Sequence, residues 1–169
     1  MSEILWAPWR IDYILSDKHK GCLFCDKPKE GNDDDNLILI RRNTCLVMLN
    51  RYPYNNGHLL IAPYRHISSL EGLTAEEMTG LMVTIKECME LLRRVMSPHG
   101  FNIGMNIGKV AGAGIVDHCH FHIVPRWNGD TSFMPVLAET RVMPEHLRAT
   151  YKKLKEGLSF GRGEKRTGG

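Results

Sequence analysis

The sequence contains no run of about 20 apolar residues, the length that a membrane-spanning helix needs, so the chain is not expected to cross a membrane. Its first residues lack the basic and then apolar pattern of an export signal. The five cysteines are an odd number, which does not suit a complete set of disulfides and indicates free or metal-bound thiols. Together these features favour a cytoplasmic location.

A strong excess of charge is also missing. The formal net charge is +3, and part of it lies near the end of the chain, in Arg162, Lys165 and Arg166. No dense basic patch is visible in the sequence. Nucleic acid is therefore not expected as a partner.

The length of 169 residues fits one domain that buries a sizeable core. We predict an N-terminal arm over residues 1–20, a domain over 21–158 and a disordered tail over 159–169. The arm contains Trp6-Ala7-Pro8-Trp9. This aromatic segment either packs over the core or contacts a substrate.

Helical and alternating patterns within the domain predict an α+β fold, an antiparallel sheet of about five strands with a long helix on one face. Thr74 and Glu77 have the spacing of a capping box and open that helix. Its apolar residues are expected to form one buried stripe, namely Met78, Leu81, Met82, Ile85, Met89 and Leu92. The remaining elements are expected as strands at 37–41, 44–49, 58–62, 101–107, the histidine segment and near 133–137, and a second helix at 144–158.

The most unusual segment is His118-Cys119-His120-Phe121-His122, in which three histidines occupy every second position. In a β-strand this spacing puts the three imidazoles on one face, roughly 6–7 Å apart, and turns the residues between them towards the core. A neutral imidazole offers one hydrogen-bond donor and one acceptor, and its usual pKa is about 6.5. Such a row can hold a metal, supply a nucleophile or bind a phosphate.

With Pro125-Arg126 behind them, the three histidines resemble the histidine triad (HIT) superfamily of nucleotidyl hydrolases and transferases. Asn50 and Gly57-His58 are similar to the first nucleotide-contacting strand and turn of that family. Asn106, with the glycine-rich loop behind it, is similar to its phosphate-side segment. The resemblance implies a HIT domain over 21–158 and a homodimer formed by pairing of two sheets.

Residues 5–10 and 125–130 add a resemblance to a bacterial branch of the family, the diadenosine polyphosphate phosphorylases and hydrolases. The resemblance implies that His120 attacks the α-phosphorus of a nucleotide and forms a covalent nucleotidyl-histidine. It also implies that His122 donates a hydrogen bond to a phosphate oxygen, and that water or phosphate then releases the nucleotide. His58 either faces the nucleotide pocket or is an ordinary strand histidine.

Phosphate contacts are expected from the loop amides of Gly112, Ala113 and Gly114, and a more distal phosphate is expected to meet Arg126. The chain departs from the family pattern at Gly114, where many relatives carry a glutamine-like donor. Backbone donors therefore carry more of the expected phosphate contact.

Cys22 and Cys25 form a single C-x-x-C pair, which suits a metal site, a redox pair or two packed thiols. The resemblance to zinc-containing HIT proteins adds His66 and His118 as the two remaining ligands. The four residues would make a closed, structural Cys₂His₂ zinc site. A zinc ion there would also fix the segment that presents His120.

The favoured function is cleavage of nucleoside phosphoanhydrides, above all dinucleoside polyphosphates, through His120. One alternative is a zinc-stabilised nucleotide-binding or interaction module with little turnover, and another is a nucleoside phosphoramidate hydrolase. Transfer of the nucleotide to phosphate, rather than to water, is a further possibility that the residues leave open.

Overall fold

The computed structural model describes residues 21–130 and 145–160. The predicted arm, the strand expected near 133–137 and all but the first two residues of the predicted tail lie outside the described residues. None of the helices in the described ranges is long and apolar enough to span a membrane.

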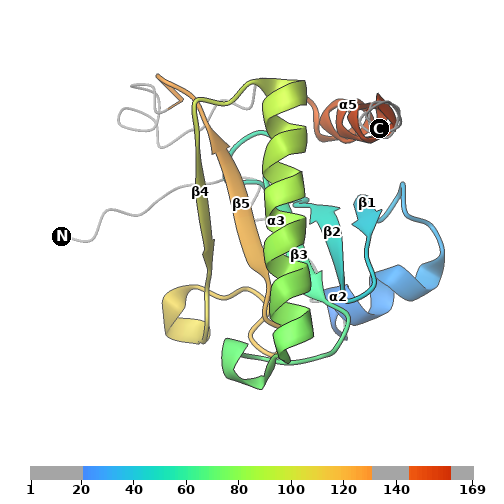
Figure 1. The fold of residues 1–169 in the computed structure, drawn as a ribbon, viewed down its shortest axis with the longest axis vertical. Helices are drawn as coiled ribbons and strands as arrows, with labels where there is room; N and C mark the ends of the chain where they lie inside the picture. Colours follow the sequence, from blue (N-terminus) through green and yellow to red (C-terminus); the bar gives the residue numbers. More distant parts are fainter. Residues whose placement is uncertain (1–20, 131–144, 161–169) are drawn as a thin grey trace, which may run out of the picture.

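In the described ranges, five strands form one antiparallel sheet, as the sequence predicts (Figure 1). They are β1 (Ile38–Arg41), β2 (Cys45–Leu49), β3 (Leu59–Pro63), β4 (Gly100–Met105) and β5 (Phe121–Arg126), and their order in the sheet is β1-β2-β3-β5-β4. β4 is therefore an edge strand, and β5 lies between β3 and β4. The pairing of β4 with β5 confirms the predicted hairpin-like unit on either side of the glycine-rich loop.

The long helix α3 (Ala75–Met96) lies across the sheet and packs on β2, β3 and β5 (Figure 1). Its predicted capping box is confirmed, because the Glu77 amide donates to Thr74 Oγ1 at 3.2 Å and the Thr74 amide donates to Glu77 Oε2 at 2.8 Å. These two bonds satisfy amides that have no partner inside the helix. They fix where α3 begins against the sheet.

The predicted buried stripe of α3 is wrong at two positions. Met78 and Met82 are 45% and 50% exposed. Met82 lies about 100° around the helix from the buried Leu81, and so outside the face that meets the sheet. The residues of α3 that are buried are Leu81, Thr84, Ile85, Cys88, Leu91 and Leu92.

The strands β1, β2 and β3 are buried on both faces, so they read as continuous apolar runs rather than as alternating ones. On the α3 side their alternate residues join the main core. On the other side a smaller core gathers around Phe24, which comes from the short helix α2 (Leu23–Asp26). This second face is the one on which the histidines lie, since Phe24 contacts the rings of His118 and His120.

The second helix is confirmed as α5 (Leu147–Phe160), which packs on α3 and β1. The acidic run that follows the short 3-10 helix η1 (Lys27–Glu30) helps to hold it, since Asp35 pairs with Arg148 and Asp34 accepts a hydrogen bond from Tyr151. The buried Thr150 hydroxyl lies 2.8 Å from Asn56 Oδ1, which ties α5 to the turn between β2 and β3. Two further 3-10 helices are η2 (Leu70–Gly72) and η3 (Lys109–Ala111).

The histidine strand starts three residues later than predicted, at Phe121. The ladder with β3 ends at Ile61 and the ladder with β4 ends at Met105, and both have Phe121 as their last partner. Before Phe121 the backbone bonds to a loop residue instead of to β3 or β4, since the Cys119 amide donates to the Ile67 carbonyl. The predicted alternation is nevertheless confirmed, because Cys119 and Ile123 are buried in the α3-side core.

Candidate functional site

His120 is 5% exposed, and the position of its proton can be inferred from one hydrogen bond. Its Nδ1 lies 2.9 Å from the backbone carbonyl oxygen of His118. A carbonyl only accepts, so Nδ1 carries the proton and the ring lone pair is left on Nε2. Burial lowers the pKa of His120 below its usual value, which favours the neutral ring.

His58 and His122 form a hydrogen-bonded pair next to the His120 ring. His58 Nε2 lies 2.9 Å from His122 Nδ1, and the His122 ring centroid lies 4.9 Å from that of His120. His58 Nδ1 accepts from the Tyr54 backbone amide at 3.0 Å. A backbone amide only donates, so the His58 proton must lie on Nε2 and is donated to His122.

The proton of His122 is therefore on its Nε2. Burial, together with His120, lowers the pKa of His122 to about 4, so the ring is neutral near pH 7 and holds a single proton. Among the described residues, His122 Nε2 is a buried side-chain nitrogen that has no hydrogen-bond partner. A buried donor without an acceptor costs about 1–3 kcal/mol, so the site is built to receive an acceptor there.

The sequence did not predict this chain of hydrogen bonds from the Tyr54 amide through His58 to His122, which we call the proton relay. His58 is completely buried and makes its contact with His122 rather than with an open pocket. Asn50, expected at the nucleotide, donates through Nδ2 to His58 Nδ1 at 3.2 Å and accepts the Tyr52 amide on Oδ1. The turn chemistry of residues 50–57 was visible in the sequence, but which atoms it would bring together was not.

The predicted phosphate-side segment begins where β4 ends. Met105 and Phe121 form the last pair of the ladder, so Asn106 directly follows β4 and His120 directly precedes β5. In the loop beyond, the Gly112 and Ala113 amides donate to the Lys109 and Gly108 carbonyls. Gly112 has a φ of +86°, so this turn needs glycine. Two of the three amides expected to bind phosphate are thus used inside the loop, and their contact with phosphate stays a prediction.

The structure does not bring Arg126 to the triad. It lies at the far end of β5, four residues beyond His122 and roughly 13 Å along the strand. Its guanidinium forms a two-pronged ion pair with Asp130, at 2.6 and 2.8 Å, and also donates to Asn102. Contact with a distal phosphate stays a prediction.

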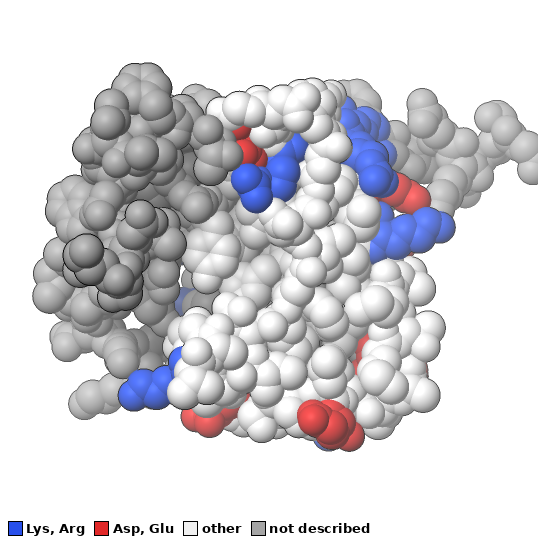
Figure 2. All heavy atoms as spheres, turned by 90° about the vertical axis from the view of Figure 1, so that its left-hand side faces the viewer, with Lys and Arg blue, Asp and Glu red and all other residues white. Residues whose placement is uncertain are grey.

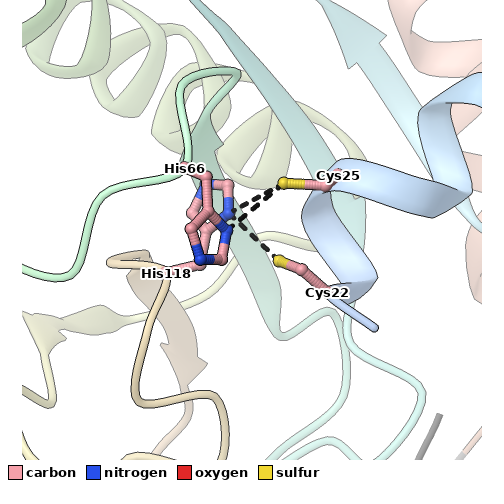
Figure 3. Close-up of side chains that lie close together, drawn as sticks. All are labelled: Cys22, Cys25, His66 and His118. Atoms are coloured by element: carbon pink, nitrogen blue, oxygen red, sulfur yellow. Dashed lines mark hydrogen bonds between the residues drawn. The ribbon is translucent and has the colours of Figure 1, made fainter. Parts of the chain in front are cut away.

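The four predicted metal ligands come together from three segments (Figure 3). Cys22 directly precedes α2 and Cys25 lies within it, His66 follows β3, and His118 precedes β5. One ligand atom from each residue lies within 4.8 Å of all the others. Cys22 Sγ is 3.1 Å from His118 Nδ1, and Cys25 Sγ is 3.4 Å from His66 Nδ1 and 3.6 Å from His118 Nδ1.

These distances fit the donor set of a tetrahedral zinc site. Zinc–sulfur and zinc–nitrogen bonds of about 2.3 and 2.0–2.1 Å give edges of roughly 3.3–3.8 Å between ligand atoms. His118 also has the right tautomer, because its Nε2 lies 2.9 Å from the Pro63 carbonyl and must carry the proton. Its Nδ1 lone pair therefore faces the thiols. The cluster therefore has the donor types and approximate spacing that a zinc ion needs.

The structure is an α+β domain built on an antiparallel sheet. It places three alternating histidines at and just before the start of β5, beside the Cys/His cluster. The chain belongs to the HIT family, since the model of the HIT domain matches residues 31–129. This confirms the resemblance drawn from the sequence.

Named relatives and solved structures agree with this family. The AP-4-A phosphorylase of Mycobacterium tuberculosis is 36% identical over 159 residues, which cover 89% of this chain and 81% of the relative. The adenosine 5'-monophosphoramidase of Schizosaccharomyces pombe is 27% identical over 128 residues, covering 76% and 91%. A zinc-bound histidine triad family protein from Mycobacterium smegmatis superposes with a TM-score of 0.65 at 26% identity, covering 85% and 96%.

The buried His58 predicts that folding is sensitive to acid. Burial, with smaller effects of His122 and His120, lowers the pKa of His58 to about 3. Between that value and the usual value of about 6.5 the unfolded chain binds a proton that the folded protein does not. The free energy of unfolding is thus highest above about pH 6.5 and falls as the pH drops, by about 2 kcal/mol for this group at pH 5.

Urea unfolding near pH 7.5 and near pH 5 checks this expectation. His58→Gln should reduce the loss of stability between the two pH values, whereas His99→Gln, at an exposed position, should leave it unchanged. An equal loss in the wild type and in His58→Gln would contradict the assignment.

Proposed function

We propose that this protein cleaves nucleoside phosphoanhydrides, with dinucleoside polyphosphates as the favoured substrates, through a nucleotide linked covalently to His120. The observation that carries the proposal is the pair of neighbouring imidazoles with opposite roles. His120 offers a lone pair on Nε2 while His122 offers a proton on Nε2, and neither ring can exchange roles without breaking a hydrogen bond.

In the first step His120 Nε2 attacks the α-phosphorus. The new nitrogen–phosphorus bond forms as the bond from phosphorus to the bridging oxygen breaks, and the leaving nucleotide keeps that electron pair. The His118 carbonyl stabilises the positive charge that develops on the ring, because it accepts the Nδ1 proton. Charge accumulates on the oxygens of the transferred phosphoryl group, and the unpartnered His122 Nε2–H is placed to meet one of them.

In the second step water or inorganic phosphate attacks the same phosphorus and breaks its bond to His120. Diadenosine tetraphosphate would release ATP first, and then AMP with water or ADP with phosphate. The similarity to an AP-4-A phosphorylase favours phosphate as the acceptor. Phosphate-dependent ADP formation, followed by mass, supports phosphorolysis, while AMP in both conditions supports hydrolysis.

The proposal predicts that substitutions of His120 and His122 lower kcat by different factors. His120→Asn removes the nucleophile and should lower kcat by about 10³-fold or more, with nucleotide still bound. His122→Asn removes one transition-state donor and should lower kcat by about 10²-fold. His99→Asn is the matched control and should turn over like the wild type. Comparable turnover in His120→Asn and the wild type would contradict the covalent mechanism.

The similarity to a monophosphoramidase makes nucleoside phosphoramidates the second candidate substrate class. Their leaving group is an amine, which must gain a proton as it departs, so this reaction depends more on His122 as an acid. Wild-type protein that cleaves a phosphoramidate but not diadenosine tetraphosphate would favour this class. Wild-type protein that binds nucleotide and cleaves neither would favour the binding module.

We also propose that the Cys/His cluster binds one structural zinc ion. When bound, the ion would supply a fixed cation that holds α2, the segment after β3 and the segment before β5 together. His118 links this cluster to the site, because its ring is a ligand and its carbonyl holds the His120 proton. The free thiols that such a site needs support a cytoplasmic location, which cell fractionation tests.

The zinc proposal predicts one zinc per chain by elemental analysis. Cys22→Ser should lose the metal, while Cys45→Ser, at a buried thiol that lies in the core and outside the cluster, should keep it. Chelation should lower the midpoint of thermal unfolding, because the ion binds only the folded cluster tightly. Equal zinc content in Cys22→Ser and Cys45→Ser would rule out this site.

A homodimer through the β4 edge is the assembly we propose. β4 is six residues long, lacks charged residues and proline, and exposes Ile103 at 41%. Unprotected edges of this kind pair with another strand. Figure 2 shows this side of the molecule, and the described residues across its centre are almost all uncharged.

The dimer is checked by light scattering on a sizing column. Ile103→Lys should shift the protein to the mass of a monomer, since it places two charges in a paired edge, whereas Glu156→Lys on an exposed position of α5 should not. A wild-type monomer, or an unchanged dimer in Ile103→Lys, would overturn this arrangement.

A further inference from the structure

Tyr54, a residue of the turn between β2 and β3, contacts both histidines of the proton relay. Its ring stacks on His122 with centroids 5.7 Å apart and 14° between the planes. The same ring packs on His58 at 4.7 Å and 35°. Its backbone amide is the donor to His58 Nδ1. One half-buried residue therefore fixes the relay through its main chain and covers it with its side chain.

The surroundings of His122 show why this cover matters. Within the part of the chain that the structure describes, the titratable side chains in ring contact with His122 are His58, His120 and Tyr54, and its cross-strand neighbours Leu60 and Gly104 carry no charge. No acidic group among them holds the ring in one protonation state. Burial is the largest cause of the lowered pKa of His122, and the Tyr54 ring supplies part of that burial. Attraction between the aromatic face and an imidazolium acts in the opposite direction.

We propose that Tyr54 is a positioning residue that keeps His122 neutral with its single proton on Nε2, and so makes His122 a donor in one direction only. Without the ring, water reaches the His58–His122 hydrogen bond and competes for both nitrogens. A protonated His122 would then aim its Nδ1–H at the His58 Nε2–H, and the relay would break. This inference rests on the proposed function for its consequence in catalysis, but its structural part can be tested without substrate.

The test compares Tyr54→Leu, which removes the ring, with Tyr54→Phe, which keeps it. Tyr64→Leu is a control of the same size change at a tyrosine that is 36% exposed. In the first measurement, nitrogen NMR of labelled histidines follows the protonation of His122 with pH in the free protein. Tyr54→Leu should raise its titration midpoint from about 4 towards 6.5 and mix the two neutral tautomers. Tyr54→Phe and Tyr64→Leu should match the wild type.

The second measurement is the pH profile of kcat and KM with diadenosine tetraphosphate. Tyr54→Leu should lower kcat by about tenfold near pH 6, with a smaller loss at pH 8 and little change in KM. A loss that is equal at every pH, with an unmoved His122 titration, would show a merely structural residue and overturn the inference. If Tyr54→Leu does not fold, Tyr54→Met is titrated in its place.

The two measurements separate this inference from the proposed function. A wild-type protein that turns over no nucleotide, with a His122 titration that moves in Tyr54→Leu, would refute the proposed function and uphold the role of Tyr54. Active wild type with identical titrations in wild type and Tyr54→Leu would refute the role of Tyr54 alone.

Discussion

The site depends on the fact that a backbone amide can only donate a hydrogen bond. The Tyr54 amide donates to His58, and this single contact decides where the His58 proton lies. His58 then decides the tautomer of His122, whose remaining N–H is left buried and unpartnered. No charged side chain is needed to set this order. The low pKa values of His58 and His122 keep both rings neutral, so the order survives at physiological pH.

His120 is fixed in the opposite way, by a backbone group that accepts a hydrogen bond instead of donating one. The His118 carbonyl accepts from His120 Nδ1 and leaves a lone pair on Nε2. The same residue points its own Nδ1 at Cys22, because its Nε2 is held by the Pro63 carbonyl. The Cys/His cluster and His120 are thus both held by His118, the cluster through its ring and His120 through its carbonyl.

Much of this fold was readable from the sequence, and the failures have physical causes. The capping box at Thr74 and the alternation around Cys119 are local patterns, so they were predicted correctly. Met82 was assigned to the wrong face because helical spacing alone does not tell which direction around the helix faces the sheet. The start of β5 depends on where β3 and β4 end, which are contacts far apart in the sequence.

The same limit applies to the site. The spacing of the triad and the C-x-x-C pair marked candidate residues but left several uses open, and the family resemblance supplied the roles of His66 and His118 as expected metal ligands. The hydrogen bonds from Asn50 to His58 and from His58 to His122 were not predicted, since hydrogen bonds across a turn are set by tertiary structure. Contact of Asn50 or His58 with a nucleotide stays a prediction.

The most direct test of the account is to trap the covalent nucleotide. Wild-type protein and His120→Asn are quenched at alkaline pH during turnover of diadenosine tetraphosphate and digested, and the peptides are weighed. The account predicts an adenylyl group on the peptide that contains His120, lost on mild acid treatment because a phosphorus–nitrogen bond is acid-labile, and absent from His120→Asn. Rapid turnover with no adduct, or an adduct on another residue, would contradict it.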